Sequence, residues 1–235
     1  MKTTRTLLAT IILSTGLLTA TGANAALVSA LGGQVVNDTD LNVTWLSNAN
    51  LAATNSFGLA RNVDLGAIPG VNTYGGSYIY NNGTMSWGGA MKWIAAMNAS
   101  NGGAGYLGYN NWRLPTSNTC SGYNCTGSEM GHLFLSELGG AAMQPLSSST
   151  DPDKAKFTNL MSDIYWSGTE YAPDTSGGAW YFATADGGQD ASLKDLNMFA
   201  MAVRPGQVAA VPEAESWAML LAGLGLIGVA VGRRR

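Results

Sequence analysis

The two ends of the sequence set the limits of any folded domain in this chain. Residues 1–25 combine two basic residues near the start, an apolar run over 7–18 and the tripeptide Ala23-Asn24-Ala25. This order is typical of a cleaved secretory signal peptide, and the apolar run is short for a membrane anchor. We therefore expect export through the Sec machinery, with cleavage after Ala25.

The C-terminal end has an equally distinct pattern. Val211, Pro212 and Glu213 open it, residues 217–232 are uncharged and mostly apolar, and three arginines (Arg233, Arg234 and Arg235) close it. The apolar segment is a little shorter than the roughly 20 residues that cross a bilayer comfortably. The arginines would hold the C-terminus on the cytoplasmic side of the inner membrane. The segment is either a permanent anchor or a sorting signal that is recognised and then cut.

The order of these parts closely resembles the PEP-CTERM sorting signal of Gram-negative bacteria that make exopolysaccharide. In that family the signal is read by exosortase, a membrane protease-transpeptidase. The resemblance covers residues 211–235, and Ala214 stands where the family pattern has its second proline. It implies a transient inner-membrane anchor, followed by release to the cell surface, the extracellular matrix or the medium.

The body between these ends, residues 26–210, is acidic and sparsely charged. It holds seven basic and thirteen acidic residues, so its net charge is about −6. Because Lys and Arg do not cluster in it, we expect no nucleic-acid partner. The acidic balance also disfavours direct binding of anionic glycans by charge attraction.

The chain has two cysteines, Cys120 and Cys125, separated by four residues. In an exported protein a pair this close predicts a disulfide. A zinc site is not expected from these residues, because zinc usually takes four ligands and His132 is the one histidine.

Hydrophobic periodicity and turn residues predict an α+β body with long loops. We expect a hairpin over 34–46, a helix that follows Thr84 or Ser86, and a second helix over 129–138 capped by Ser128. Three strands are predicted near the end of the body, over residues 164–169, 179–184 and 199–204. The Asn- and Gly-rich segments 47–83 and 100–127 are predicted to be loops.

An ordered set of short motifs resembles the Lcl C-terminal domain family, which was first catalogued as a bacterial domain of unknown function. The motifs are Trp112-Arg113-Leu114-Pro115, Tyr165-Trp166-Ser167-Gly168, Ala179-Trp180-Tyr181-Phe182 and Val203-Arg204-Pro205. The first hairpin with Trp45 and the helix with Trp87 fit the family too, so the resemblance covers residues 34–206. The resemblance implies a C-type-lectin-like fold, related to that of formylglycine-generating enzymes, in which the first and last strands of the body pair. Trp45 and Val203 should then lie on neighbouring strands.

The motif residues allow either structural or binding roles. Arg113 and Arg204 can bind a carboxylate or sulfate, but a buried guanidinium more often forms a structural ion pair or bonds to the backbone. Trp112, Trp166 and Trp180 can stack on sugars, but such rings more often belong to the core. We favour the structural role in each case, and no ligand-binding residue is assigned.

Neither catalysis nor a cofactor is expected from the sequence. No nucleophile-elbow pattern accompanies His132, which we expect on a helix surface near Glu129. Calcium is a minor alternative, because several loop aspartates offer oxygen ligands, namely Asp151, Asp153, Asp174, Asp186 and Asp190.

The sequence therefore predicts an exported, non-enzymatic surface or matrix protein. Its expected role is adhesion or glycan contact in the extracellular polysaccharide of a biofilm. The alternatives are an enzyme on a formylglycine-generating-like fold, which would need an active thiol, and a passive structural component of the matrix.

Overall fold

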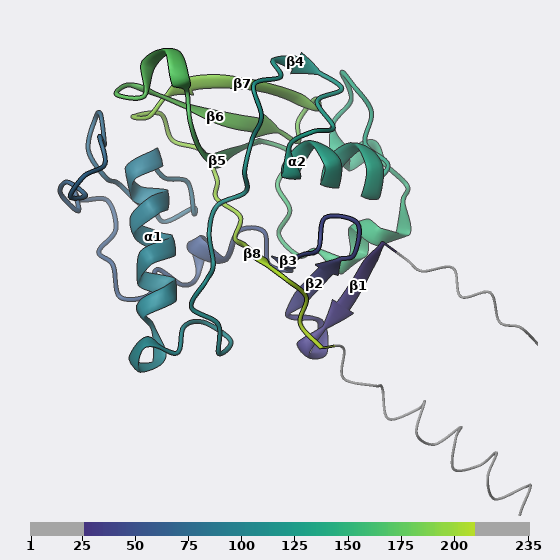
Figure 1. Ribbon diagram of the computed structural model, residues 1–235, viewed down its shortest axis with the longest axis horizontal. Coiled ribbons are helices and arrows are strands. Elements are labelled where there is room, and N and C mark those ends of the chain that lie inside the picture. The colour runs from purple at the N-terminus through teal and green to yellow at the C-terminus, as the bar shows by residue number, and fades with distance from the viewer. Residues whose placement is uncertain (1–25, 210–235) are drawn as a thin grey trace, which may run out of the picture.

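The computed structural model describes residues 26–209, which form two four-stranded antiparallel sheets and two α-helices (Figure 1). This is the mixed, loop-rich α+β architecture that the sequence predicts, with two small sheets rather than one. Short 3₁₀ turns occur along the connections, at Leu31–Gly33, Leu51–Ala53, Asn101–Gly103, Leu146–Ser148, Pro152–Lys156 and Ala172–Asp174.

The first sheet contains the predicted hairpin and the last strand of the body. Its strand order is β1 (Leu27–Ala30), β2 (Val35–Asp38), β3 (Val43–Leu46) and β8 (Val203–Pro205). Trp45 pairs directly with Val203, as expected. The last strand β8 nevertheless pairs with β3 and not with the first strand of the body. The first strand is β1, which was not predicted and which pairs with β2 at the other edge of the sheet.

The second sheet has the order β4 (Gly122–Tyr123), β7 (Gly188–Leu193), β6 (Gly178–Ala183) and β5 (Ile164–Glu170). β5 and β6 match predicted strands, whereas β4 and β7 were not predicted. The strand predicted over 199–204 is wrong for its first half. Phe199 bridges to the second sheet through Tyr165, and the chain joins the first sheet only at Val203, so this segment crosses between the two sheets.

Helix α1 (Trp87–Ala99) begins at Ser86, whose hydroxyl accepts a hydrogen bond from the Gly89 amide at 3.2 Å. This is the stabilising N-cap geometry that the sequence suggests. A side chain at Gly89 would collide with the carbonyl oxygen of Tyr78, so the helix approaches that loop at backbone distance. The close approach explains why a helix-weakening glycine stands here.

Helix α2 (Glu129–His132) is capped by Ser128 as predicted, but it does not continue as a regular α-helix. Residues Leu133–Glu137 form a π-helical turn, closed by a hydrogen bond from the Leu138 amide to the Leu133 carbonyl at 3.0 Å. The predicted helix over 129–138 is therefore correct in extent and wrong in its second half.

The core has two clusters, and strand β5 contributes to both. Trp166 packs in the cluster around α1, while its neighbour Tyr165 packs in the cluster around α2 and the first sheet. Alternation along a strand sends adjacent side chains to opposite faces, so β5 separates the clusters.

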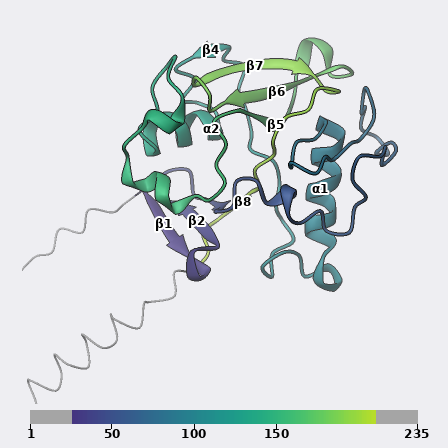
Figure 2. The same ribbon diagram turned by 180° about the vertical axis from the view of Figure 1, so that it is seen from behind.

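The two ends of the described chain lie close together. Seen from both sides, the two ends of the described segment lie at the end of the molecule that carries β1 and β2 (Figures 1 and 2). The buried Asn37 side chain fixes this arrangement, because its amide donates to the Val208 carbonyl at 2.6 Å and accepts from the Val208 amide at 3.0 Å.

Candidate functional site

The first family motif is held in place by an ion pair. Both terminal nitrogens of Arg113 lie 2.6 Å from the carboxylate oxygens of Glu129. Glu129 also accepts a hydrogen bond from the Thr116 amide at 2.7 Å, and the Arg113 backbone pairs with Val203. The structural ion pair predicted for Arg113 is present, and it joins the 112–116 segment to helix α2. The guanidinium is therefore already occupied by a carboxylate of the protein itself.

Arg204 is held without an acidic partner in the described part of the chain. Its Nε donates to the Asn111 side-chain oxygen at 2.9 Å, and its guanidinium carbon lies 4.1 Å from the centroid of the Tyr109 ring. This cation–π contact and the hydrogen bond replace the ion pair that was one expectation for the residue. Pro205, which follows it, pairs with Val43 at the edge of the first sheet.

The motif tryptophans are buried. Trp112, Trp166 and Trp180 are 2%, 0% and 5% exposed. The indole N–H of Trp112 donates to the Tyr106 carbonyl, and that of Trp166 donates to the Met85 carbonyl, at 3.0 and 2.9 Å. The rings of Trp112 and Trp166 belong to the core cluster around α1, whereas Trp180 lines a surface cavity beside Tyr171. Leu114 is buried beside them, and the Ser167 carbonyl accepts the Trp87 indole N–H.

The predicted disulfide between Cys120 and Cys125 is present, and it closes the loop that carries β4. The buried Gln189 of β7 donates to the Asn118 side-chain oxygen at 2.9 Å and to the Cys120 carbonyl at 2.7 Å. The cross-linked loop is thus fixed against β7, its neighbour in the second sheet.

Three adjoining cavities surround Asp190 on β7. Strand β4 pairs only with Gly188 and Gln189, so no strand of the described residues pairs with β7 on that side from Asp190 onward. The cavities have volumes of about 380, 310 and 300 Å³, at the lower end of the range typical of ligand sites. Asp190 contributes to all three.

The lining of these cavities combines aromatic rings with carboxylates. Tyr123, Tyr171 and Tyr181 supply the rings, and Tyr123 is 39% exposed. Asp174 and Asp186 add to the negative charge of Asp190. Burial raises the pKa of the Tyr181 hydroxyl, and the charges of Asp190 and Asp186 add to that shift, so Tyr181 stays neutral and can donate a hydrogen bond.

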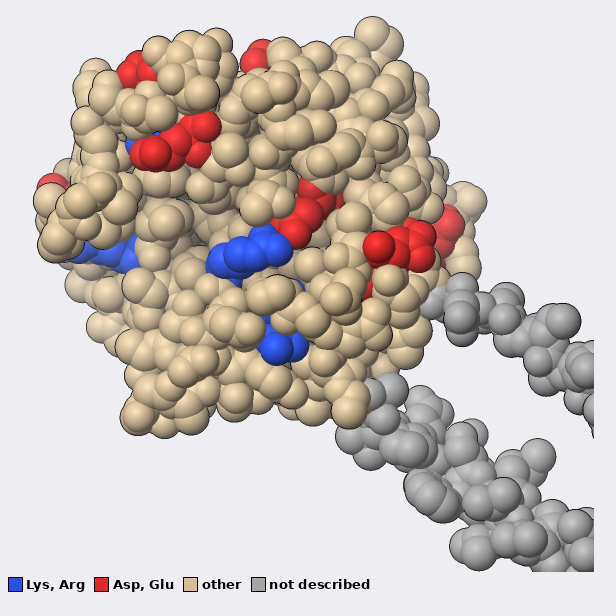
Figure 3. Space-filling model, in the orientation of Figure 1, with Lys and Arg blue, Asp and Glu red and all other residues tan. Residues whose placement is uncertain are grey.

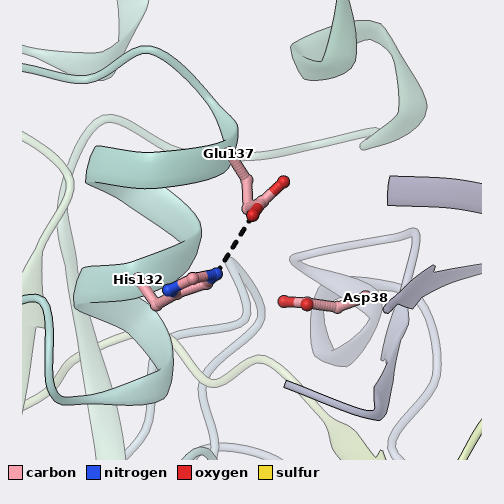
Figure 4. A group of neighbouring side chains, drawn as sticks. All are labelled: Asp38, His132 and Glu137. Atoms are coloured by element: carbon pink, nitrogen blue, oxygen red, sulfur yellow. Dashed lines mark hydrogen bonds and ion pairs between the residues drawn. The ribbon is translucent and has the colours of Figure 1, made fainter. Parts of the chain in front are cut away.

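A second polar cluster joins the first sheet to helix α2 (Figure 4). Asp38 ends β2, His132 ends α2 and Glu137 ends the π-helical turn, and one potential ligand atom from each lies within 4.8 Å of the others. His132 Nε2 is 3.0 Å from a carboxylate oxygen of Glu137. The histidine that was expected on the helix surface has a side chain only 18% exposed, and its ring lies beside Glu137 and Asp38 (Figure 4).

The five loop aspartates considered for calcium each serve local structure. Asp151 accepts from the Asp153 amide, Asp153 pairs with Lys156, and Asp174 accepts from Ser176. Asp186 and Asp190 accept from Tyr123 and Ser121. Among residues 26–209, three acidic or histidine side chains lie close enough to share an ion only in the cluster of Asp38, His132 and Glu137.

Lys194 is a buried charge that the sequence analysis did not identify. Its ammonium donates to Glu170 at 2.7 Å and to the carbonyls of Asn72 and Thr175, and it lies 4.2 Å from the Trp87 ring centroid. These partners satisfy all three donors of the group. Lys194 therefore has a structural role, tying the 47–83 loop to the second sheet.

Charged side chains cover little of the surface. On the face shown in Figure 3 most residues are uncharged, and the basic side chains form no extended patch.

The signal segment 1–25 with its cleavage residue Ala25, and the tail from Val211 to Arg235 with its apolar segment 217–232, lie outside the described residues. Among the residues that are described, no helix has the length and apolar character needed to span a membrane.

Comparisons with known proteins match two parts of the chain. The Lcl C-terminal domain matches residues 34–204, and the PEP-CTERM protein-sorting motif matches residues 210–235. A search among curated proteins found no similar sequence. The two matches fall on the segments in which the motifs were recognised.

Proposed function

Since the chain belongs to the Lcl C-terminal domain family and carries the PEP-CTERM signal of exosortase-sorted extracellular proteins, we propose that its body is a non-enzymatic module that contacts a neutral glycan. The role fits adhesion within the extracellular polysaccharide layer. The contact surface is the group of cavities around Asp190 on β7.

The observation that carries this proposal is the pairing of rings and carboxylates along one sheet edge. The faces of Tyr123 and Tyr171 offer apolar surface to the C–H groups of a sugar ring. Asp190 and Asp186 offer acceptors for sugar hydroxyls. The local negative charge would repel a sulfated or uronate-rich chain, so a neutral polysaccharide is the better ligand.

The disulfide supports the non-enzymatic role over the alternative of an enzyme. Both cysteines of the sequence are joined, and an enzyme of the formylglycine-generating kind needs a reactive thiol. Thiol labelling of the exported protein without reductant tests this point. Labelling at Cys120 or Cys125 would favour the enzyme.

The glycan contact is tested by titrating the exported protein with neutral polysaccharide from the host matrix. Asp190→Ala removes a charged acceptor and should weaken binding about tenfold or more, because hydrogen bonds to charged groups contribute roughly 1.5–3 kcal/mol. Tyr123→Ala should also weaken it. Tyr74→Ala is the matched control, since Tyr74 is exposed and lies outside the three cavities.

Equal affinities for the Asp190→Ala, Tyr74→Ala and unmodified proteins would reject the cavities as the binding site. Absence of saturable binding to any neutral polysaccharide would favour the passive structural component.

Processing by exosortase is tested by the intact mass of protein from the native host. We expect loss of residues 1–25 and of the segment that follows about Glu213. Recovery of Arg235 in extracellular material would reject cleavage of the tail.

A further inference from the structure

The cluster of Asp38, His132 and Glu137 carries more negative charge than its surroundings balance. Asp38 is 0% exposed and Glu137 is 8% exposed, so both carboxylates are withdrawn from water. Among residues 26–209, Glu137 forms an ion pair with His132, and Asp38 forms none. Even a charged imidazole leaves one negative charge over, and buried charge without a partner is costly.

The backbone is shaped to bring these groups together. In a regular α-helix, residues five positions apart point about 140° away from each other. The π-helical turn Leu133–Glu137 closes its hydrogen bond over five residues instead, which returns Glu137 to the side of His132. Single π turns of this kind are uncommon and are found frequently at functional sites.

Asp38 completes the group from the first sheet. One of its oxygens accepts from the Leu41 amide at 2.9 Å and the other accepts from the Trp45 indole at 3.2 Å. These donors fix the carboxylate while each oxygen keeps a free lone pair, and its oxygens point into the space between His132 and Glu137 (Figure 4). Outer hydrogen bonds of this kind are typical of carboxylates that bind metals.

We propose that Asp38, His132 and Glu137 bind one divalent transition-metal ion, with zinc as the best-suited metal. One imidazole nitrogen and two carboxylate oxygens form a donor set that zinc accepts, and water would take the fourth position. Calcium and magnesium prefer sets made of oxygen alone.

The distances suit this ion after a small adjustment. Ligand atoms on one tetrahedral zinc lie roughly 3.4 Å apart. His132 Nε2 and Glu137 already lie 3.0 Å apart, and the whole group lies within 4.8 Å. Side-chain rotation supplies the difference. The bound ion would link the β2–β3 hairpin to helix α2, so its role is to stabilise the fold.

The test is calorimetric titration of the exported protein with Zn²⁺ after dialysis against a chelator. We expect one zinc per chain. His132→Gln and Glu137→Gln should each weaken binding at least about tenfold, since loss of even an outer-shell partner commonly costs 10–100-fold. Asp40→Asn is the matched control, because Asp40 is exposed, lies two residues beyond Asp38 and is not a member of the group.

No saturable zinc binding by the unmodified protein, or equal affinities in all variants, would overturn the proposal. X-ray absorption at the zinc edge of the unmodified protein gives a result that does not depend on the variants folding. One imidazole with oxygen ligands supports the site, and sulfur ligands or the absence of imidazole reject it.

Discussion

Replacing Trp166 by alanine tests whether the motif tryptophans hold the fold together. The ring is 0% exposed, packs in the cluster around α1 and donates its indole N–H to the Met85 carbonyl. Truncating a fully buried Trp typically costs about 3–5 kcal/mol. The Met85 carbonyl keeps its bond from the Met198 amide, so no orphaned acceptor adds to this cost.

The expected loss of about 4 kcal/mol corresponds to a fall of about 1.5 M in the urea midpoint, if the slope is about 2.5 kcal/mol per M. The assay is urea unfolding followed by far-UV circular dichroism, because fluorescence would report the missing ring itself. Trp166→Phe is the control. It keeps most of the apolar area, loses one hydrogen bond and should cost only about 1–2 kcal/mol.

Trp180→Ala should lower the free energy of unfolding by about 3 kcal/mol, because Trp180 is 5% exposed and contacts Tyr171 at the sheet edge. A midpoint for Trp166→Ala within about 0.3 M of the unmodified protein would refute the core assignment, because it would correspond to less than about 1 kcal/mol. Loss of glycan binding with an unchanged midpoint would instead move the ring into the binding site.

Three further outcomes are expected from local features. Reducing the Cys120–Cys125 disulfide should lower the free energy of unfolding by only about 2 kcal/mol, because the closed loop is short. Thermal unfolding with and without reductant measures this loss, and an unchanged melting temperature would contradict it. Arg113→Met should lower the free energy of unfolding by about 1–2 kcal/mol; this value is reduced for solvent screening, because the Arg113 side chain is one-third exposed. A double-mutant cycle with Glu129→Gln should assign most of this loss to the coupling energy between the two side chains. Burial, and next a neighbouring carboxylate, raise the pKa of Glu137, so the metal-free folded state binds more protons than the unfolded state. Protonated Glu137 therefore stabilises the fold fully below about pH 4.5, and this stabilisation is lost as the pH rises. Glu137→Gln should flatten the curve of unfolding free energy against pH in this range.

The parts of the fold that follow local sequence rules could be predicted. The hairpin follows from two apolar runs around a turn of Asn and Asp residues, and α1 follows from its serine cap and helical spacing. β5 and β6 each contain a run of large apolar residues. These signals need no knowledge of distant residues.

The missed elements depend on distant partners. Strand β7 is rich in polar residues and is a strand because β6 offers a free edge. Two-residue β4 is held there by the disulfide and by Gln189. Local spacing alone gives little indication of such pairings.

The candidate sites were hidden for a similar reason. The spacing of His132 and Glu137 puts them on different faces of an ordinary helix, and the π turn that aligns them does not follow from local helix signals. Asp38 comes from a strand almost a hundred residues earlier. The buried Lys194 likewise finds its partners on three separate segments.

The clamp of Asn37 on Val208 limits how far the sorting motif can stand from the folded body. Glu213 stands five positions after Val208, and the apolar segment begins nine positions after Val208, at residue 217. At about 3.3–3.6 Å per residue, a fully extended chain spans only about 17 Å to Glu213 and about 30 Å to the apolar segment. The sorting motif is therefore tethered to the pole of the folded body that carries β1 and β2. The second sheet lies toward the opposite pole in Figure 1. The cavities around Asp190 belong to the second sheet, so they lie away from the pole to which the tail is attached.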